Sequence, residues 1–232
     1  MDEARGLADR LESVKERIRA AAVRSGRSAE SVRLLAVTKG FPAETVRAAM
    51  ALGLREFGEN RVQEAEKKIA AVQPRPRWRL VGHLQSNKAG RAVQLFDAID
   101  SIDSESLARE VSRRAAESGK RIECLVEVNT SGEASKFGVS PGGALGLLRA
   151  VRDGEGISAG GLMTIGPLGG GPDGARRAFR LLATLRSEAL EAGLLSEDAE
   201  LSMGMSDDFE VAIEEGATLV RIGTGLFGRR AA

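Results

Sequence analysis

Lys39 is the residue of this chain whose position most suggests covalent chemistry. It directly follows residues 34–38, LLAVT, a run with the continuous apolar character of a buried strand. Desolvation at the end of such a strand lowers the pKa of an ammonium group, and a neutral amine can attack a carbonyl carbon to form an imine. Carbonyl compounds that react in this way include the cofactor pyridoxal phosphate (PLP). The alternative is a structural ion pair between Lys39 and a carboxylate such as Glu59.

Two segments near the end of the chain combine hydroxyl side chains with glycines. They are residues 202–206, SMGMS, and residues 223–225, GTG. Glycine lets backbone N–H groups approach an anion closely, and a helix expected over residues 207–215 would add its positive end. Either segment alone is also typical of a tight turn. Together they favour a phosphate site.

Arg221 stands two residues before the second of these segments and is expected to point into the same site. A guanidinium does not release its proton, so a pyridine nitrogen that accepts a hydrogen bond from it stays unprotonated. A pyridine ring in that state, such as the ring of PLP, is a weaker electron sink than one whose nitrogen is paired with an aspartate. Such a ring stabilises a carbanion less well. The alternative for Arg221 is a structural pair with a carboxylate.

Two further polar residues follow expected strands. His83 could stack on or hydrogen-bond a ligand, or could be a satisfied structural histidine. Asn60 could donate to a phenolic oxygen, or could cap the helix that follows it. His83 is the one histidine, and the chain has no tyrosine, so mechanisms that need a tyrosine base or paired histidine metal ligands are excluded. We expect no metal site.

Short apolar runs alternate with amphipathic segments and predict the elements that position these residues. The strands are expected at residues 32–37, 54–57, 78–81, 98–102, 122–128, 157–164, 200–203 and 218–222. The helices between them are expected at residues 43–52, 61–72, 87–95, 104–118, 142–151, 175–192 and 207–215, with a short one at the end of the chain. Residues 166–172 are expected to form a surface loop.

Eight strands, each followed by a helix, predict a single (β/α)8 TIM-type barrel over residues 1–232. An amphipathic helix over residues 1–25 is expected to pack on the barrel as an addition to it. An open doubly wound sheet is the alternative. In a barrel the carboxyl ends of all strands meet at one face, which would bring Lys39, Asn60, His83 and the two glycine segments together.

Composition restricts the partners of the protein. The chain has 34 Lys and Arg against 33 Asp and Glu, a formal charge of +1, so neither nucleic acid nor a membrane is an expected partner. A single cysteine, Cys124, rules out an intramolecular disulfide. With no N-terminal apolar run, we expect a cytoplasmic protein, and without an obvious apolar stripe, a monomer or weak dimer.

Six motifs, in order along nearly the whole chain, together resemble the pyridoxal phosphate homeostasis protein family, also called the proline synthase co-transcribed family. They are LLAVTK (34–39), FGENRVQE (57–64), GHLQSNK (82–88), GLMTI (161–165), LSMGMS (201–206) and VRIGT (220–224). The resemblance implies a barrel similar to the N-terminal domain of alanine racemase, with PLP held as an imine on Lys39.

The same resemblance implies roles for the other residues. Ser202, Gly223 and Thr224 would bind the phosphate, Arg221 would face the pyridine nitrogen, Asn60 would lie beside the ring, and His83, Met163 and Met203 would line the pocket. Members of the family are regarded as carriers or regulators of PLP that affect amino-acid pools, with PLP-dependent apoenzymes as possible recipients and no established turnover. The racemase uses a tyrosine that this chain lacks, so we assign no catalytic residue.

Two other functions stay open at this point. One is a PLP-dependent amino-acid racemase in which Lys39 is the base, and the other is a barrel enzyme whose lysine forms an imine with a sugar phosphate, without PLP.

Overall fold

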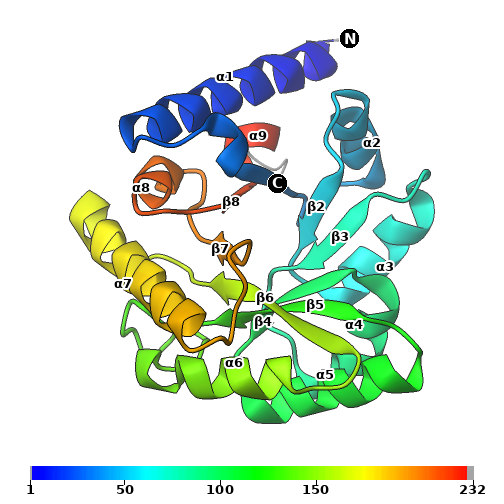
Figure 1. The fold of residues 1–232 in the computed structure, drawn as a ribbon. Helices are drawn as coiled ribbons and strands as arrows, with labels where there is room; N and C mark the ends of the chain where they lie inside the picture. The colour runs from blue at the N-terminus through cyan, green and yellow to red at the C-terminus, as the bar shows by residue number, and fades with distance from the viewer. Residues whose placement is uncertain (1, 229–232) are drawn as a thin grey trace.

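The predicted strands close into a barrel in the computed structural model, which describes residues 2–228 (Figure 1). Within these residues the barrel contains eight parallel strands: β1 (Arg33–Val37), β2 (Glu56–Glu59), β3 (Arg77–Leu80), β4 (Ala98–Ile102), β5 (Ile122–Glu127), β6 (Ile157–Met163), β7 (Glu200–Ser202) and β8 (Leu219–Ile222). β8 pairs with β1, with Leu34 opposite Val220. The TIM-type barrel is therefore confirmed, and the open sheet is wrong.

Helices cover the outside of the barrel between successive strands (Figure 1). They are α2 (Ala43–Ala51), α3 (Val62–Ala71), α4 (Ala89–Leu95), α5 (Glu105–Glu117), α6 (Ala144–Arg152), α7 (Gly171–Glu191), α8 (Phe209–Glu214) and, after the last strand, α9 (Thr224–Phe227). Short 3-10 turns precede β1, α4 and α6, at Ala29–Ser31, Ser86–Lys88 and Pro141–Gly143.

Two predicted boundaries differ from the structure for local reasons. The second strand was expected to start at Leu54, but the Leu54 N–H donates to the Ala49 carbonyl across Gly53, at a φ of +94°, so Leu54 still belongs to the end of α2. Helix α7 begins at Gly171 rather than at Ala175, because Pro172 in its first turn needs no intrahelical donor and already has a helical φ.

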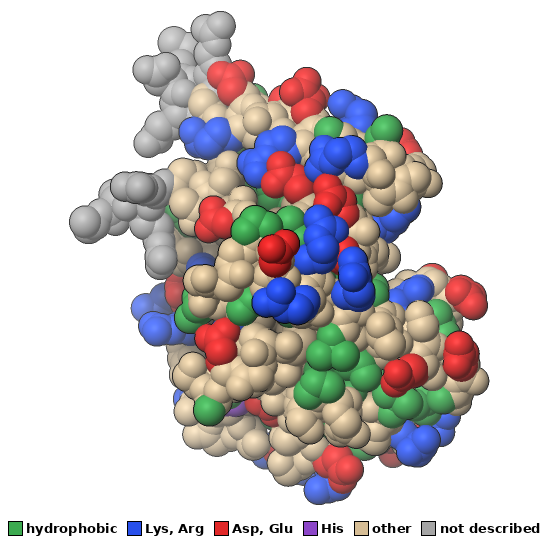
Figure 2. Space-filling view, turned by 90° about the vertical axis from the view of Figure 1, so that its left-hand side faces the viewer, with side chains coloured by type: hydrophobic (Ala, Val, Ile, Leu, Met, Phe, Trp, Pro, Cys, Tyr) green, Lys and Arg blue, Asp and Glu red, His purple; other side chains and the backbone are tan. Residues whose placement is uncertain are grey.

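The additional N-terminal helix, α1 (Asp2–Arg24), packs across α8 and α9. Its buried face carries Leu7, Leu11, Val14 and Ile18 at the predicted spacing of three and four residues. Ion pairs run from arginines of α1 and α7 to glutamates of α8 and the residue after it: Arg17–Glu210, Arg24–Glu214, Arg176–Glu214 and Arg180–Glu215. Figure 2 shows this side of the molecule, where basic and acidic side chains are interspersed.

The amino-terminal end of the barrel is filled by a buried ion network. Arg79 is fully buried, and its guanidinium lies 2.8 Å from an oxygen of Asp100 and 2.7 Å from an oxygen of Glu200. Burial alone would lower the pKa of Arg79, but these two carboxylates raise it above its ordinary value. The network closes this end of the barrel, so a ligand has to enter from the other end.

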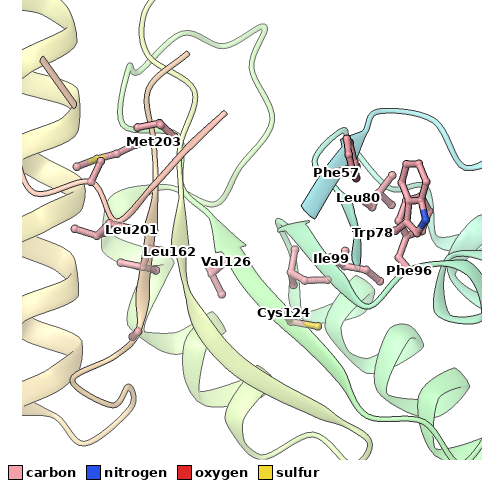
Figure 3. Close-up of a cluster of buried hydrophobic side chains, with 14 of the residues drawn as sticks. Phe57, Trp78, Leu80, Phe96, Ile99, Cys124, Val126, Leu162, Leu201 and Met203 are labelled. Atoms are coloured by element: carbon pink, nitrogen blue, oxygen red, sulfur yellow. The ribbon is translucent and has the colours of Figure 1, made fainter. Parts of the chain in front are cut away.

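Above this network, Leu35, Val37, Val81 and Leu219 form an apolar cluster inside the barrel. Side chains on the outer face of the strands pack against the helices in a second, larger cluster, which Figure 3 shows in part. Phe57 and Trp78 are among its largest members, with ring centroids 5.7 Å apart. These alternating faces fix which residue of each strand can reach the open end.

Candidate functional site

A cavity of about 500 Å³ opens at the carboxyl ends of the strands. Five of the predicted site residues line it: Lys39, Asn60, Arg221, Gly223 and Thr224. The remaining lining residues are Arg17, Val37, Val81, Ile165, Met205, Ser206, Asp207 and Gly225. Its volume lies in the range of small-molecule sites. Strands β1, β2 and β8 therefore bring together residues that are far apart in sequence.

Lys39 reaches the cavity because it continues the inward-facing positions of β1. Leu35 and Val37 point into the barrel, and Lys39 stands two residues further on. The carboxylate offered as its structural partner, Glu59, is bound by other residues. The Lys68 ammonium and the Thr38 hydroxyl, the latter at 2.6 Å, both donate to Oε1 of Glu59. Lys68 itself is nearly fully buried, so Lys68 and Glu59 form a buried structural ion pair here.

Arg221 is buried inside the barrel below the cavity, where neutral acceptors hold it. Its Nη1 donates to the carbonyl and to the hydroxyl of Ser202, at 2.6 and 2.9 Å, and its Nη2 donates to the Thr164 carbonyl at 2.7 Å. Burial lowers the pKa of Arg221, although Asp100, Glu127 and Asp208 oppose the shift. The guanidinium is thus fixed in orientation, and no carboxylate within residues 2–228 is bound directly to it.

The two glycine segments meet on one wall of the cavity. The backbone N–H of Gly225 donates to the hydroxyl of Ser206 at 3.0 Å, which joins the turn after β7 to the turn after β8. Gly204 makes the first turn possible, because its φ is +90° and a Cβ there would lie 2.5 Å from the Cβ of Ala212. The hydroxyls of Ser206 and Thr224 therefore lie on the same wall.

Four predicted site residues do not line the cavity. The Ser202 hydroxyl is buried under Arg221. Met203 is fully buried in the outer core together with Leu201, on the α7 side of β7 (Figure 3). Met163 is fully buried beside Ser202 in the register of β6 and β7.

His83 lies outside the cavity wall as well. Its ring stacks on Phe137, with centroids 3.7 Å apart and planes at 8°, and its Nδ1 lies 3.1 Å from Asp103. This stack connects the end of β3 to the long connection between β5 and α6.

Sequence reasoning missed Ser206, Asp207 and Arg17 as lining residues. Ser206 belongs to the segment 202–206 that the sequence analysis identified. Because β7 ends at Ser202, Ser206 lies beyond the strand, and this position is the signal that could have indicated it as a lining residue. Arg17 carried no local signal, since it lies on the polar side of a helix outside the barrel. Among residues 2–228, three cationic side chains, Arg17, Lys39 and Arg221, and one carboxylate, Asp207, line the cavity, which favours an anionic ligand.

No cluster of three or more metal-ligating side chains occurs within residues 2–228, and none of the helices described there is long and apolar enough to cross a membrane.

Curated relatives and a family model both match almost the entire chain. The pyridoxal phosphate homeostasis protein of Aquifex aeolicus is 42% identical over 96% of this chain and 97% of its own length. The protein of the same name from Pseudomonas aeruginosa is 41% identical, over 97% of this chain and 96% of its own length. The family model described as alanine racemase, N-terminal domain, matches residues 10–231. This chain belongs to the pyridoxal phosphate homeostasis protein family.

Solved structures agree with this assignment. PipY of Synechococcus elongatus, solved with PLP bound, has a TM-score of 0.82 and 39% identity, covering 96% of this chain and all of that one. The same protein without PLP has a TM-score of 0.86. An alanine racemase from Clostridium difficile is 14% identical, with a TM-score of 0.73 over 87% of this chain and 56% of its own, and shares the barrel fold.

Proposed function

We propose that this protein binds PLP in the cavity at the carboxyl ends of the strands and acts as a carrier or regulator of PLP in the cytoplasm. The observation that carries the proposal is the meeting of an amine, a guanidinium and two hydroxyl-bearing turns in one cavity: Lys39, Arg221, Ser206 and Thr224. PLP has an aldehyde, a pyridine nitrogen and a phosphate, and each of these finds a matching group. The PLP-bound structure of PipY supports the same ligand.

Bound PLP supplies an aldehyde that condenses with amines and a ring that can accept electrons. We assign the covalent attachment to Lys39, whose amine would hold the aldehyde carbon as an imine. The phosphate would lie on the wall where the turns after β7 and β8 meet, within reach of the Ser206 and Thr224 hydroxyls and the glycine-rich backbone. Asn60, on the end of β2, would lie beside the ring.

Ser202, His83, Met163 and Met203 act indirectly in this proposal. Ser202 holds Arg221, and Met163 packs beside Ser202. Met203 packs under the turn after β7, and His83 holds the connection that contains Phe137. None of these four needs to touch the cofactor to affect its binding.

Arg221 favours a carrier over an enzyme. The Arg221 guanidinium is held by Ser202 and Thr164, and it would donate to the pyridine nitrogen of bound PLP and keep that nitrogen unprotonated, which would weaken the ring as an electron sink. The chain also lacks a tyrosine, so the base that alanine racemase uses on the opposite face of the ring has no counterpart. We therefore propose that PLP is held and passed on, with PLP-dependent apoenzymes as recipients, rather than used for turnover.

Absorbance and turnover measurements test this function. Wild-type protein loaded with PLP and freed of unbound PLP should keep visible absorbance that borohydride bleaches, and Lys39→Ala should not. Lys67→Ala, which changes an exposed lysine on α3, should behave as wild type. Pure wild-type protein should show no sustained conversion of L- to D-amino acids. Sustained conversion that Lys39→Ala abolishes would make the protein a racemase, and absence of PLP binding by the wild type would refute the proposed ligand.

A further inference from the structure

Among the described residues that line the cavity, Arg17 is the one that does not come from the barrel. It lies in the fifth turn of α1, the helix that precedes the barrel in the chain, yet it lines the same cavity as Lys39, Ser206 and Thr224. Helix α1 reaches this position because it packs on α8 and α9, the two helices that follow the cavity turns. The cavity wall formed by those turns is therefore completed from outside the barrel.

The Arg17 side chain is held in a defined geometry although it is about half exposed. Its Nε and Nη2 donate to the two carboxylate oxygens of Glu210, at 2.8 and 2.9 Å. Its guanidinium carbon lies 4.5 Å from the centroid of the Phe209 ring. A two-point ion pair and an aromatic face together orient the guanidinium plane, so little side-chain entropy is lost when a further anion binds.

The charge of the neighbouring residues explains why a cation is needed here. Asp207 lines the cavity directly after Ser206 and acts electrostatically on Arg17, as Glu210 does. Two carboxylates beside the wall that receives the phosphate would repel a phosphate dianion. Arg17 offsets that repulsion, and the other two cations of the cavity, Lys39 and Arg221, are assigned to the aldehyde and the pyridine nitrogen.

We propose that Arg17 makes α1 part of the binding site by recognising the phosphate group of the ligand. This inference rests on the proposed function and adds a residue to it. It states that the preference of the protein for a phosphorylated ligand over the same ligand without phosphate depends on a residue of the N-terminal helix. A residue that only fixed α1 to the barrel would affect both ligands equally.

The test compares Arg17→Gln with Arg24→Gln. Arg24 lies seven residues further along α1 on the same side, pairs with Glu214 of α8 at 2.9 Å, and does not line the cavity. Each full-length variant is titrated with PLP and with pyridoxal, which lacks the phosphate. We expect Arg17→Gln to weaken PLP binding about tenfold, as the loss of one charge-assisted hydrogen bond does, and to leave pyridoxal binding within about twofold. Arg24→Gln should change neither.

Arg17→Lys gives a second measurement, and it also serves if Arg17→Gln does not fold. It keeps the positive charge, so PLP should bind within about threefold of wild type, and added salt should weaken PLP binding more than pyridoxal binding. Equal losses for both ligands in Arg17→Gln, or equal losses of PLP in the Arg17 and Arg24 variants, would overturn the inference and leave the proposed function intact. A wild type that binds neither ligand would overturn both.

Discussion

The two ends of the barrel hold the same residue type in opposite surroundings. At the closed end, Arg79 is bound directly by Asp100 and Glu200, and those carboxylates raise its pKa. At the open end, Arg221 is bound by two carbonyls and a hydroxyl, and burial lowers its pKa. The protein neutralises the first charge itself, so that charge serves the fold. The second charge is only oriented, so it can serve a ligand.

The largest effect should come from breaking the closed end. Arg79→Met would leave Asp100 buried without its cation and Glu200 with Arg33 alone, which costs about 3–5 kcal/mol in the free energy of unfolding. Urea unfolding measures this loss. Arg79→Lys keeps the positive charge but cannot bind two carboxylates with a planar guanidinium, so it should lose less of the free energy of unfolding than Arg79→Met. A stable Arg79→Met variant would show that the network is not structural.

Glu127, the last residue of β5, should make the stability of the protein depend on pH. It is almost fully buried at the end of β5, and burial raises its pKa to about 7, while Arg221 opposes the shift and Asp103 and Asp100 add to it. In the unfolded chain the same group ionises near 4.5. Between these two pH values the folded protein therefore holds the Glu127 proton more tightly than the unfolded chain does. The stability contributed by this proton is fully present below pH 4.5 and is lost as the pH rises through about 7.

Glu127→Gln should remove this pH dependence. A pKa rise of this size corresponds to about 3 kcal/mol in the free energy of unfolding. The stability of the variant relative to the wild type should therefore increase by up to about that amount between pH 4.5 and pH 8. Urea unfolding of both proteins across this range gives the difference directly, because other titrating groups cancel. If the difference did not change with pH, the pKa of Glu127 would be the same in the folded protein as in the unfolded chain.

Arg221→Gln should have the smallest effect on stability and a specific effect on the ligand. The Thr164 and Ser202 carbonyls lose donors, which costs about 1–2 kcal/mol, less than at Arg79 because no carboxylate is left unpaired. PLP should still attach to Lys39, but the visible spectrum of the complex should shift, because the ring nitrogen loses its donor. A stability loss as large as that of Arg79→Met, with an unchanged spectrum, would contradict the comparison.

The difference between the two ends also explains what the sequence could predict. Strand positions can be predicted from short apolar runs. The location of Lys39 and Arg221 in the site can be predicted from the same runs, because both residues stand at or just beyond strand ends on inward-facing positions. The pairing of Glu59 with Lys68 depends on how α3 lies against β1 and β2. No local pattern contains that information.

The same limit applies to the phosphate wall. The segment from Ser202 to Ser206 was recognised, but which hydroxyl faces the cavity depends on the turn at Gly204 and on the hydrogen bond to Gly225. Arg17 is 22 residues from Lys39 in sequence and reaches the site through the packing of α1 on α8 and α9. Residues placed by tertiary packing carry no signal in their neighbours along the chain.

The central claim is that the oriented cations of the open end surround an amine that binds PLP covalently. The most direct measurement is the intact mass of PLP-loaded protein after borohydride reduction, followed by peptide mapping. We predict one added pyridoxyl phosphate per chain, located on the peptide that contains Lys39. Unmodified protein, or a modification on another lysine while Lys39 stays unmodified, would contradict the account.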